Sequence, residues 1–196
     1  MLTVYSAHDS HFINAQADQF ANLKVVPSGG DLQEAALAGR LFTACNSTKV
    51  ATTAGVTTTW TGLCISNVST NKNAIVHEFG WGLMIAADVA GNIGLQTCSI
   101  AAPAAAVTAY NCLDGEATSS AVYADDGATL VSPRQVRTFG EYGTEDTATS
   151  FFNHGPHIVN LRGSLILPPG RTVATFTTLA TTACFQFYFL WEEVDA

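Results

Sequence analysis

Charged side chains are scarce in this sequence: only 12% of its 196 residues are Asp, Glu, Lys or Arg, whereas 47% are apolar. An ordinary soluble domain carries about twice that share of charge. Uncharged polar and small residues must therefore cover much of the surface. Such a surface loses little hydration free energy when it is pressed against another subunit, so we expect the protein to form a homo-oligomer, most simply a trimer.

Basic residues are few and scattered along the chain, as Lys49, Lys72, Arg134 and Arg162 illustrate. The 16 acidic residues outnumber the 8 basic ones and give a formal net charge of -8. Nucleic-acid binding depends on clustered Lys and Arg side chains that neutralise phosphates. We therefore expect no nucleic-acid partner.

Cysteine pairs with a recognisable spacing are missing. The 5 cysteines are odd in number and include no C-x-x-C pair, whereas a disulfide framework favours an even set in a small secreted chain. We expect reduced thiols that are buried as small apolar side chains. They are Cys45, Cys64, Cys98, Cys112 and Cys184.

Targeting and membrane-spanning segments are also missing from the pattern. The opening residues, MLTVYSAHDS, do not combine a basic stretch with an apolar one, and no apolar run approaches the length that crosses a bilayer. The expectation is a protein that folds in a cytoplasm and has no membrane partner.

Established catalytic motifs are absent as well. The sequence contains no G-x-S-x-G, P-loop, G-x-G-x-x-G or H-E-x-x-H pattern. We therefore predict that the protein is not an enzyme, and we assign no catalytic, cofactor-binding or metal-binding residue.

Two histidine clusters contain residue types that could carry chemistry. His154 and His157 could share a metal ion, but Pro156 between them prevents a helical face from presenting both, and two ligands are too few. The run from His8 to His11 contains the residue types of a Ser-His-Asp triad, but triads are assembled in space rather than within one tetrapeptide. A loop and a solvated terminus are the preferred interpretations.

Acidic residues offer a third candidate. Glu141, Glu145, Asp146 and the pair Asp125-Asp126 could supply oxygen ligands to calcium, but the EF-hand spacing is missing. Solvated loop carboxylates are favoured, because Asp and Gly are common in turns.

His77 and Glu78 form another possible pair. They are neighbours in a period-two segment and are expected on opposite faces of a strand, so they should not act together. A buried or interfacial His77 is preferred.

The chain divides most simply into an extended N-terminal arm, residues 1–30, and a single β-sandwich domain, residues 31–196. Asp31 and Glu34 resemble a capping box, which predicts a short helix to about Leu37 that ends at Gly39. The arm is expected to pack on a neighbouring subunit as readily as on its own domain.

Alternating apolar residues after Gly39 predict strands. Two glycines beside Trp81, Gly80 and Gly82, indicate a bulge or a close backbone approach. The predicted strands are 56–65, 74–86, 93–100, 158–167, 171–178 and 183–194, with weaker ones near 107–112 and 120–123.

The last third of the chain is the most regular. Pro168-Pro169-Gly170 predicts a type II turn that joins the strands before and after it into a hairpin. The alternating aromatics from Phe185 to Trp191 predict a long interior strand. The whole pattern indicates a mostly β fold, an antiparallel β-sandwich of jelly-roll type with one short N-terminal helix, although pattern alone does not separate a sandwich from a barrel.

These features together resemble the small β-sandwich cement or decoration proteins of tailed-bacteriophage capsids. The resemblance rests on the arm, the capped helix, the Thr-rich strands, EFGWG at Glu78 to Gly82 and GSLILPPGRTVATF at Gly163 to Phe176. It implies a virion structural protein on the capsid exterior whose partners are the major capsid protein and copies of itself, with no cofactor and no catalysis.

Two alternatives remain open. A phage tail, fibre or baseplate subunit that binds glycans would expose Trp60 or Trp81 beside acidic loops, whereas a cement protein would bury both in the sheets. A cupin-like metalloenzyme would need three or four ligands that converge inside a barrel.

Overall fold

The computed structural model describes residues 2–5, 12–17, 23–25, 31–100, 104–115, 121–144 and 157–196. These residues form one helix and thirteen strands. In chain order the elements are β1 (Leu2–Tyr5), β2 (Phe12–Ala17), β3 (Leu23–Val25), α1 (Asp31–Leu37), β4 (Leu41–Cys45), β5 (Val50–Thr52), β6 (Thr59–Asn67), β7 (Lys72–Leu83), β8 (Gly91–Ile100), β9 (Ala109–Asn111), β10 (Val122–Tyr142), β11 (His157–Leu167), β12 (Thr172–Thr177) and β13 (Thr181–Asp195). Over these described ranges, no helix has the length and apolar content needed to cross a membrane.

Helix α1 ends where the sequence predicts. Gly39 takes a positive φ of 67°, its N–H donates to the Ala36 carbonyl (2.9 Å), and the Arg40 N–H donates to the Ala35 carbonyl (2.9 Å). This pair of hydrogen bonds is the Schellman arrangement, which uses the left-handed freedom of glycine to end the helix. The chain then turns directly into β4.

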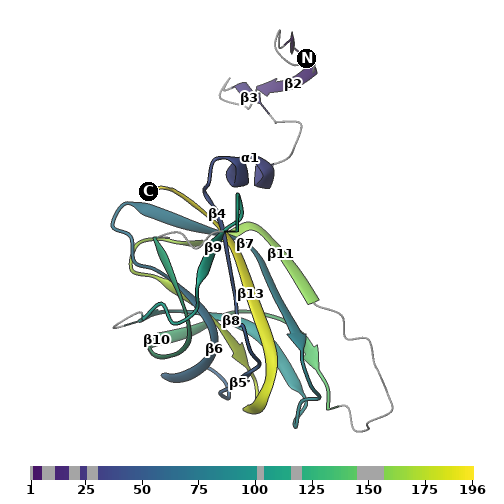
Figure 1. The fold of residues 1–196 in the computed structure, drawn as a ribbon, viewed down its shortest axis with the longest axis vertical. Helices are drawn as coiled ribbons and strands as arrows, with labels where there is room; N and C mark the ends of the chain where they lie inside the picture. Colours follow the sequence, from purple (N-terminus) through teal and green to yellow (C-terminus); the bar gives the residue numbers. More distant parts are fainter. Residues whose placement is uncertain are drawn as a thin grey trace.

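One layer of the body is a six-stranded antiparallel sheet in the order β11-β7-β13-β4-β9, with β5 pairing beside β4 on β13. Figure 1 shows β11, β7, β13 and β4 fanned out side by side. Strand β13 pairs with β7 along one edge and with β4 and β5 along the other. The prediction of an interior C-terminal strand is confirmed.

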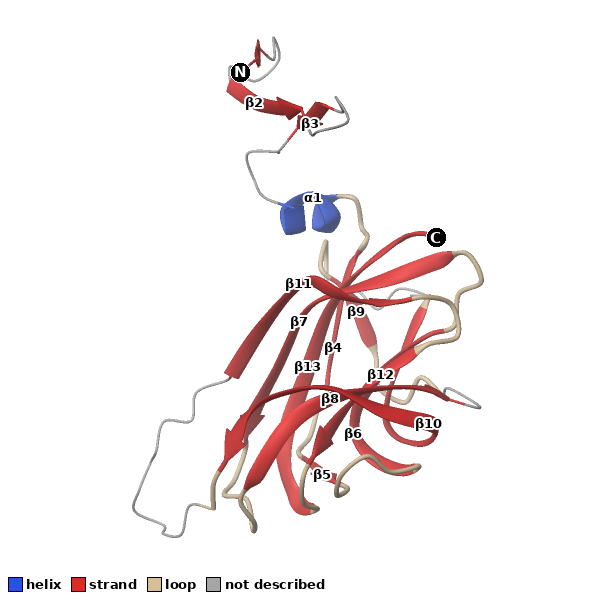
Figure 2. Ribbon diagram, turned by 180° about the vertical axis from the view of Figure 1, so that it is seen from behind, coloured by secondary structure: helices blue, strands red, loops and turns tan. Residues whose placement is uncertain are grey.

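The second layer contains β10, β6, β12 and β8, which close on themselves (Figure 2). Closure depends on β10, which is 21 residues long. Its first part, Val122 to Thr129, pairs with β6, and its second part, Leu130 to Tyr142, pairs with β8. The fold thus combines a sandwich with a small barrel in one of its layers.

The main core lies between the two layers and is rich in aromatic rings. Phe79 of β7 is at its centre, with ring centroids 5.2 Å from Phe189, 5.5 Å from Trp81 and 5.6 Å from Phe139. The alternating aromatics of β13 all point into this core, since period-two side chains share one face of a strand. They are Phe185, Phe187, Phe189 and Trp191.

A second, smaller core fills the inside of the barrel. Its buried members are Trp60, Cys64, Cys98, Leu130 and Ala174. The Trp60 indole Nε1 donates to the Thr175 carbonyl at 2.7 Å, so its polar atom is satisfied although the side chain is buried.

The described part of residues 1–30, the predicted arm, consists of three short strands. β1, β2 and β3 form a three-stranded antiparallel sheet, and none of them pairs with a strand of the sandwich among the described residues. Figures 1 and 2 place this sheet beyond α1. The domain division at residue 30 and the packing of the arm on a neighbour stay predictions.

The predicted hairpin around Pro168 to Gly170 is wrong, although the turn itself is present. The Arg171 N–H donates to the Pro168 carbonyl (3.1 Å) and Gly170 has a φ of 76°. However, β11 pairs with β7, whereas β12 pairs with β6 and β8, so the turn carries the chain from one layer to the other. Local turn chemistry fixes the direction of the chain but not the sheet it joins.

The fold class is confirmed: the protein is mostly β, built of antiparallel sheets in a sandwich-like arrangement with one short helix near the N-terminus. The jelly-roll topology stays a prediction.

Candidate functional site

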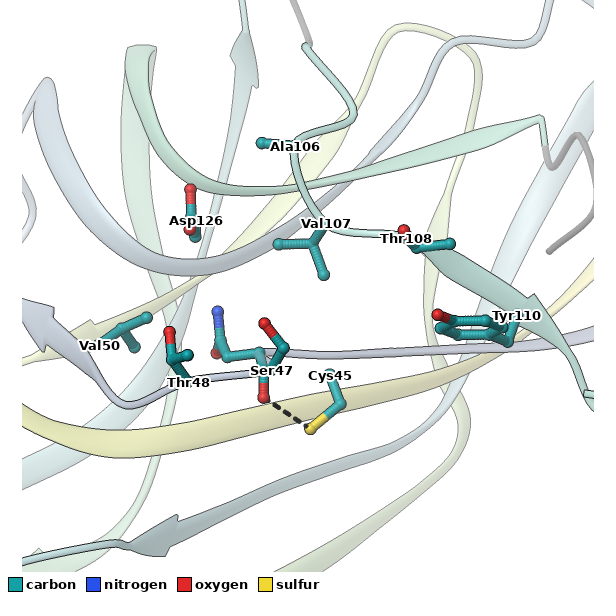
Figure 3. Close-up of a pocket in the computed structure, with 10 residues that line it drawn as sticks. Cys45, Ser47, Thr48, Val50, Ala106, Val107, Thr108, Tyr110 and Asp126 are labelled. Carbon is teal, nitrogen blue, oxygen red and sulfur yellow. Dashed lines mark hydrogen bonds between the residues drawn. The ribbon is translucent and has the colours of Figure 1, made fainter.

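A pocket of about 150 Å³ opens between the β4–β5 connection and the segment that leads into β9. Figure 3 shows side chains from both segments facing this space, with Asp126 of β10 above it. The residues that line it are Cys45, Asn46, Ser47, Thr48, Val50, Ala106, Val107, Thr108, Tyr110 and Asp126.

Asp125 does not line the pocket itself but holds the segment that forms one of its sides. Its carboxylate is buried, accepts the Ala106 N–H at 3.0 Å and accepts the Ala104 N–H at 3.2 Å. The Val107 N–H also donates to the Ala124 carbonyl (2.9 Å). A buried carboxylate is tolerated when backbone donors replace its water, so Asp125 anchors the segment that carries Val107 and Thr108.

Cys45 supplies the only thiol among the residues that line the pocket, beside the hydroxyls of Ser47, Thr48, Thr108 and Tyr110. Its Sγ donates to the Asn46 carbonyl at 3.4 Å, and partial burial raises the pKa of the thiol. No histidine lines the pocket to act as a base. The thiol therefore stays protonated near neutral pH, and the pocket offers hydrogen-bonding groups rather than an activated nucleophile.

All five cysteines carry free thiols. The predicted burial holds for Cys64, Cys98 and Cys184, whereas Cys112 is partly exposed and Cys45 is exposed. Cys45 departs from the prediction because it ends β4 on the same outer face as Tyr188, its register partner on β13.

A polar cluster lies on the outer face of the six-stranded sheet. Glu192 contacts the Arg40 guanidinium at 2.7 Å and the His77 Nε2 at 3.4 Å. Beside it, the Tyr188 hydroxyl donates to Glu78 at 3.2 Å, and burial together with this carboxylate raises the pKa of Tyr188 to about 12. The cluster ties β7 and β13 to each other and to Arg40, the residue before β4.

The expectation that His77 and Glu78 occupy opposite faces of their strand is wrong. The register between β13 and β7 shifts at this point: Leu190 pairs with Glu78, and Trp191 pairs with Val76. The bulged residue, His77, therefore reaches the same outer face as Glu78. Each then bonds to β13 rather than to the other.

The remaining predicted candidates do not come together. His157 stacks on Trp81 with ring centroids 4.9 Å apart, and Glu141 is exposed on β10. Among the residues that the structure describes, no group of three His, Cys, Asp or Glu side chains is arranged to hold a metal ion. His8, Asp9, Ser10, His11, Glu145, Asp146 and His154 lie outside the described residues.

Sequence reasoning missed the role of Asp125, which it interpreted as a solvated loop residue. The signal that could have found it is alternation: Val122 and Ala124 are apolar, so a strand through them was possible, but the following Asp125-Asp126-Gly127 resembles a turn.

No protein family matches the sequence, and neither a curated protein nor a solved structure is similar to it at a significant level.

Proposed function

We propose that this chain is a non-enzymatic structural subunit of a larger protein particle, and specifically a capsid cement or decoration protein of a tailed bacteriophage. The observation that carries the proposal is one flank of the sandwich where two sheet edges lie together. β11 pairs only with β7, and the second part of β10 pairs only with β8, within the described ranges. Ser132 and Arg134 of β10 line one hollow together with Ile166 and Leu167 of β11, so both edges belong to this flank.

The flank carries apolar side chains that water reaches. Val131 and Val136 on β10 and Ile158 and Ile166 on β11 are all exposed, Ile158 by 60%. Apolar groups that gather along one edge of a weakly charged protein suit contact with another subunit. We name these four side chains the flank apolar residues.

Both edges are nevertheless poor templates for adding a further strand. β10 has register shifts at three places and carries Pro133, while β11 has a shift between Asn160 and Leu165. Bulges and proline interrupt the row of free backbone groups that edge-to-edge pairing requires. Contacts there would be made by side chains, which favours specific assembly over open-ended aggregation.

The tryptophans support a cement protein over a glycan-binding tail or fibre subunit. Trp60, Trp81 and Trp191 are all at most 5% exposed. These are all 3 tryptophans of the chain, so none of them supplies the exposed ring on which a sugar could stack.

Sedimentation of the purified protein and fractionation of infected-cell lysate test the proposal. The expected results are an oligomer, most simply a trimer, at micromolar concentration, and recovery of the protein with DNA-filled heads. A stable monomer that is found with neither heads nor tails would contradict it, and recovery with tails would favour the alternative.

A variant pair sharpens this test. Ile158→Lys with Val136→Lys places charge on the flank and should dissociate the oligomer. Leu113→Lys is the matched control, since Leu113 is 53% exposed but follows β9, at the opposite end of the strand order. Equal effects of both changes would remove the flank from the interface.

A further inference from the structure

A hollow of about 270 Å³ lies at one end of the sandwich and contains two arginines. Arg134 of β10 and Arg171, which precedes β12, both line it, together with the hydroxyl residues Thr97 and Ser132. Ile166 and Pro168 supply an apolar side. No carboxylate is among its lining residues within the described chain.

Neither guanidinium forms an ion pair or a hydrogen bond in the described part of the protein. The ion pairs there involve Arg40, Lys72 and His77, and no hydrogen bond of the Arg134 or Arg171 side chain is present. Lys49, Arg137 and Arg162 also form no ion pair among the described residues, so what sets Arg134 and Arg171 apart is that both line the same hollow. Their mutual repulsion favours an anion between them.

Strand register allows the two side chains to converge. Arg134 pairs with Thr97 of β8, and Thr97 pairs on its other side with Val173, two residues after Arg171. Two strand spacings and this offset put the two Cα atoms roughly 12 Å apart. Arginine side chains are long enough for both guanidinium groups to contact one anion that lies between the two Cα atoms.

The backbone of β10 is shaped to deliver Arg134 to this position. Between Val131, which pairs with Ser99, and Arg134, which pairs with Thr97, the strand holds one extra residue. Regular pairing would have placed Pro133 opposite Thr97. The bulge requires Ser132 to adopt a φ of 50°, a left-handed conformation that is strained for serine before proline. Bulges of this kind re-aim side chains, and strain of this kind is concentrated at functional sites.

We propose that this hollow binds one small organic anion, with its phosphate or carboxylate group held between Arg134 and Arg171 and its carbon portion against Ile166 and Pro168. Each guanidinium presents a planar fork of N–H donors that matches either oxyanion. The Thr97 and Ser132 hydroxyls complete the set of donors. Ile166 is also one of the flank apolar residues, so the hollow borders the proposed subunit contact, but ligand binding and oligomerisation are measured separately.

Calorimetric titration at constant ionic strength tests the site, with inorganic phosphate and phenyl phosphate as probes. One saturable site per chain is expected, with phenyl phosphate bound more tightly because of the apolar wall. Arg134→Ala and Arg171→Ala should each weaken binding on the order of tenfold or more, since a charge-assisted hydrogen bond is lost. Both side chains are exposed, so the variants should fold, and circular dichroism checks this.

Arg137→Ala is the matched control, because Arg137 is an exposed neighbour on β10 that does not line the hollow. Its affinity should equal that of the unchanged protein. Absence of saturable binding, or an equal loss in all three variants, would overturn the proposal. So would an oligomer that dissociates in Arg134→Ala while phosphate fails to bind, which would make the hollow a contact between subunits.

Discussion

The phenol ring of Tyr188 on β13 lies across the backbone of Gly80, its register partner on β7. A Cβ added to Gly80 would overlap Cε1 of that ring. The glycine is buried although it has no side chain, because the ring covers it. The ring is held in place from its far end, where its hydroxyl donates to Glu78.

The same relationship recurs in the second layer. Phe176 pairs with Gly94, and Tyr142 pairs with Gly91, and in both cases the ring occupies the space that a glycine side chain would need. Glycine weakens a strand, but an aromatic ring on the neighbouring strand restores the lost contact. Each of these glycines therefore fixes the register of a strand pair.

Replacing Gly80 by alanine should lower the free energy of unfolding by about 1–3 kcal/mol, because the new methyl group forces the Tyr188 ring off the sheet. Urea denaturation followed by circular dichroism measures the change. In the double variant with Tyr188→Ala the two costs should not add, since removing the ring makes room for the methyl group.

Gly82 provides the control on the same strand. No atom lies within 4 Å of a Cβ built on it, and its φ is not in the left-handed region. Gly82→Ala should change stability by less than about 1 kcal/mol, and the reduced entropy of the unfolded chain makes a gain the expected sign. Equal destabilisation by the two changes would show that the Tyr188 contact is not the cause.

The glycines beside Trp81 illustrate what the sequence could predict. The two glycines predict a bulge or a close approach to the backbone; at Gly80 the Tyr188 ring lies close to the backbone, whereas no atom lies within 4 Å of a Cβ built on Gly82. The difference lies in β13: Tyr188 pairs with Gly80, but Gln186 pairs with Gly82. The sequence near Gly80 and Gly82 does not determine which residues of β13, more than a hundred positions away, pair with them. The sequence could therefore predict that a close approach is possible at these glycines, but not at which one it occurs.

Asp125→Ala should destabilise the protein by about 1–3 kcal/mol, because it leaves the N–H groups of Ala104 and Ala106 without their buried acceptor. Thermal unfolding monitored by circular dichroism measures the loss. Its neighbour Asp126 is exposed and serves as the control: Asp126→Ala should stay within about 0.5 kcal/mol of the parent protein. If Asp125→Ala left the stability unchanged, water would have replaced the carboxylate as the acceptor of these two N–H groups.

Two buried tryptophans should respond differently to phenylalanine. Trp60 donates its indole N–H to Thr175, whereas Nε1 of Trp191 is buried and has no hydrogen-bond partner in the described structure. Trp60→Phe loses a hydrogen bond, and Trp191→Phe removes an unsatisfied donor, while both lose similar volume. We expect Trp60→Phe to be the more destabilising by about 1–2 kcal/mol in chemical denaturation. If Trp191→Phe were instead the more destabilising change, the Trp191 indole N–H would have a hydrogen-bond acceptor in the folded protein.

Titration of Tyr188 should be visible at alkaline pH. An unfolded tyrosine titrates near pH 10, whereas burial and the Glu78 carboxylate raise the folded pKa of Tyr188 to about 12. Between these values the unfolded chain has released the proton that the folded chain keeps, so the free energy of unfolding should fall as the pH rises.

The variant Glu78→Gln isolates this effect. It removes the negative charge that disfavours the phenolate, so the pKa of Tyr188 should move down towards 10. Phenolate absorbance, compared between the variant and the parent protein, reports the shift against the background of the 5 tyrosines. Superimposable titration curves would contradict the contact.

Strand β10 shows where sequence reasoning fails in this fold. Only a short strand near 120–123 was predicted, because Gly127, Pro133 and the acidic pair at 125–126 all indicate turns. In the structure these residues lie at or beside irregularities in a strand that pairs with β6 and then with β8. Their turn chemistry bends the strand without ending it. Beyond Val122 and Ala124 the sequence has no period-two alternation from which the rest of the strand could be predicted.

Removing residues 1–26 should leave the sandwich intact and weaken attachment to its partner. The strands within that segment pair only with one another among the described residues, and the deletion keeps Asp31 and α1. All 3 tryptophans belong to β6, β7 and β13, so fluorescence-detected urea unfolding reports the sandwich alone. We expect the same midpoint for the truncated and the full chain, together with a reduced share of the truncated protein in the head fraction of a lysate. A segment that makes no buried contact with the sandwich cannot lower its free energy of unfolding when it is deleted. A lower midpoint, or loss of soluble protein, would therefore make the N-terminal sheet part of the folded core.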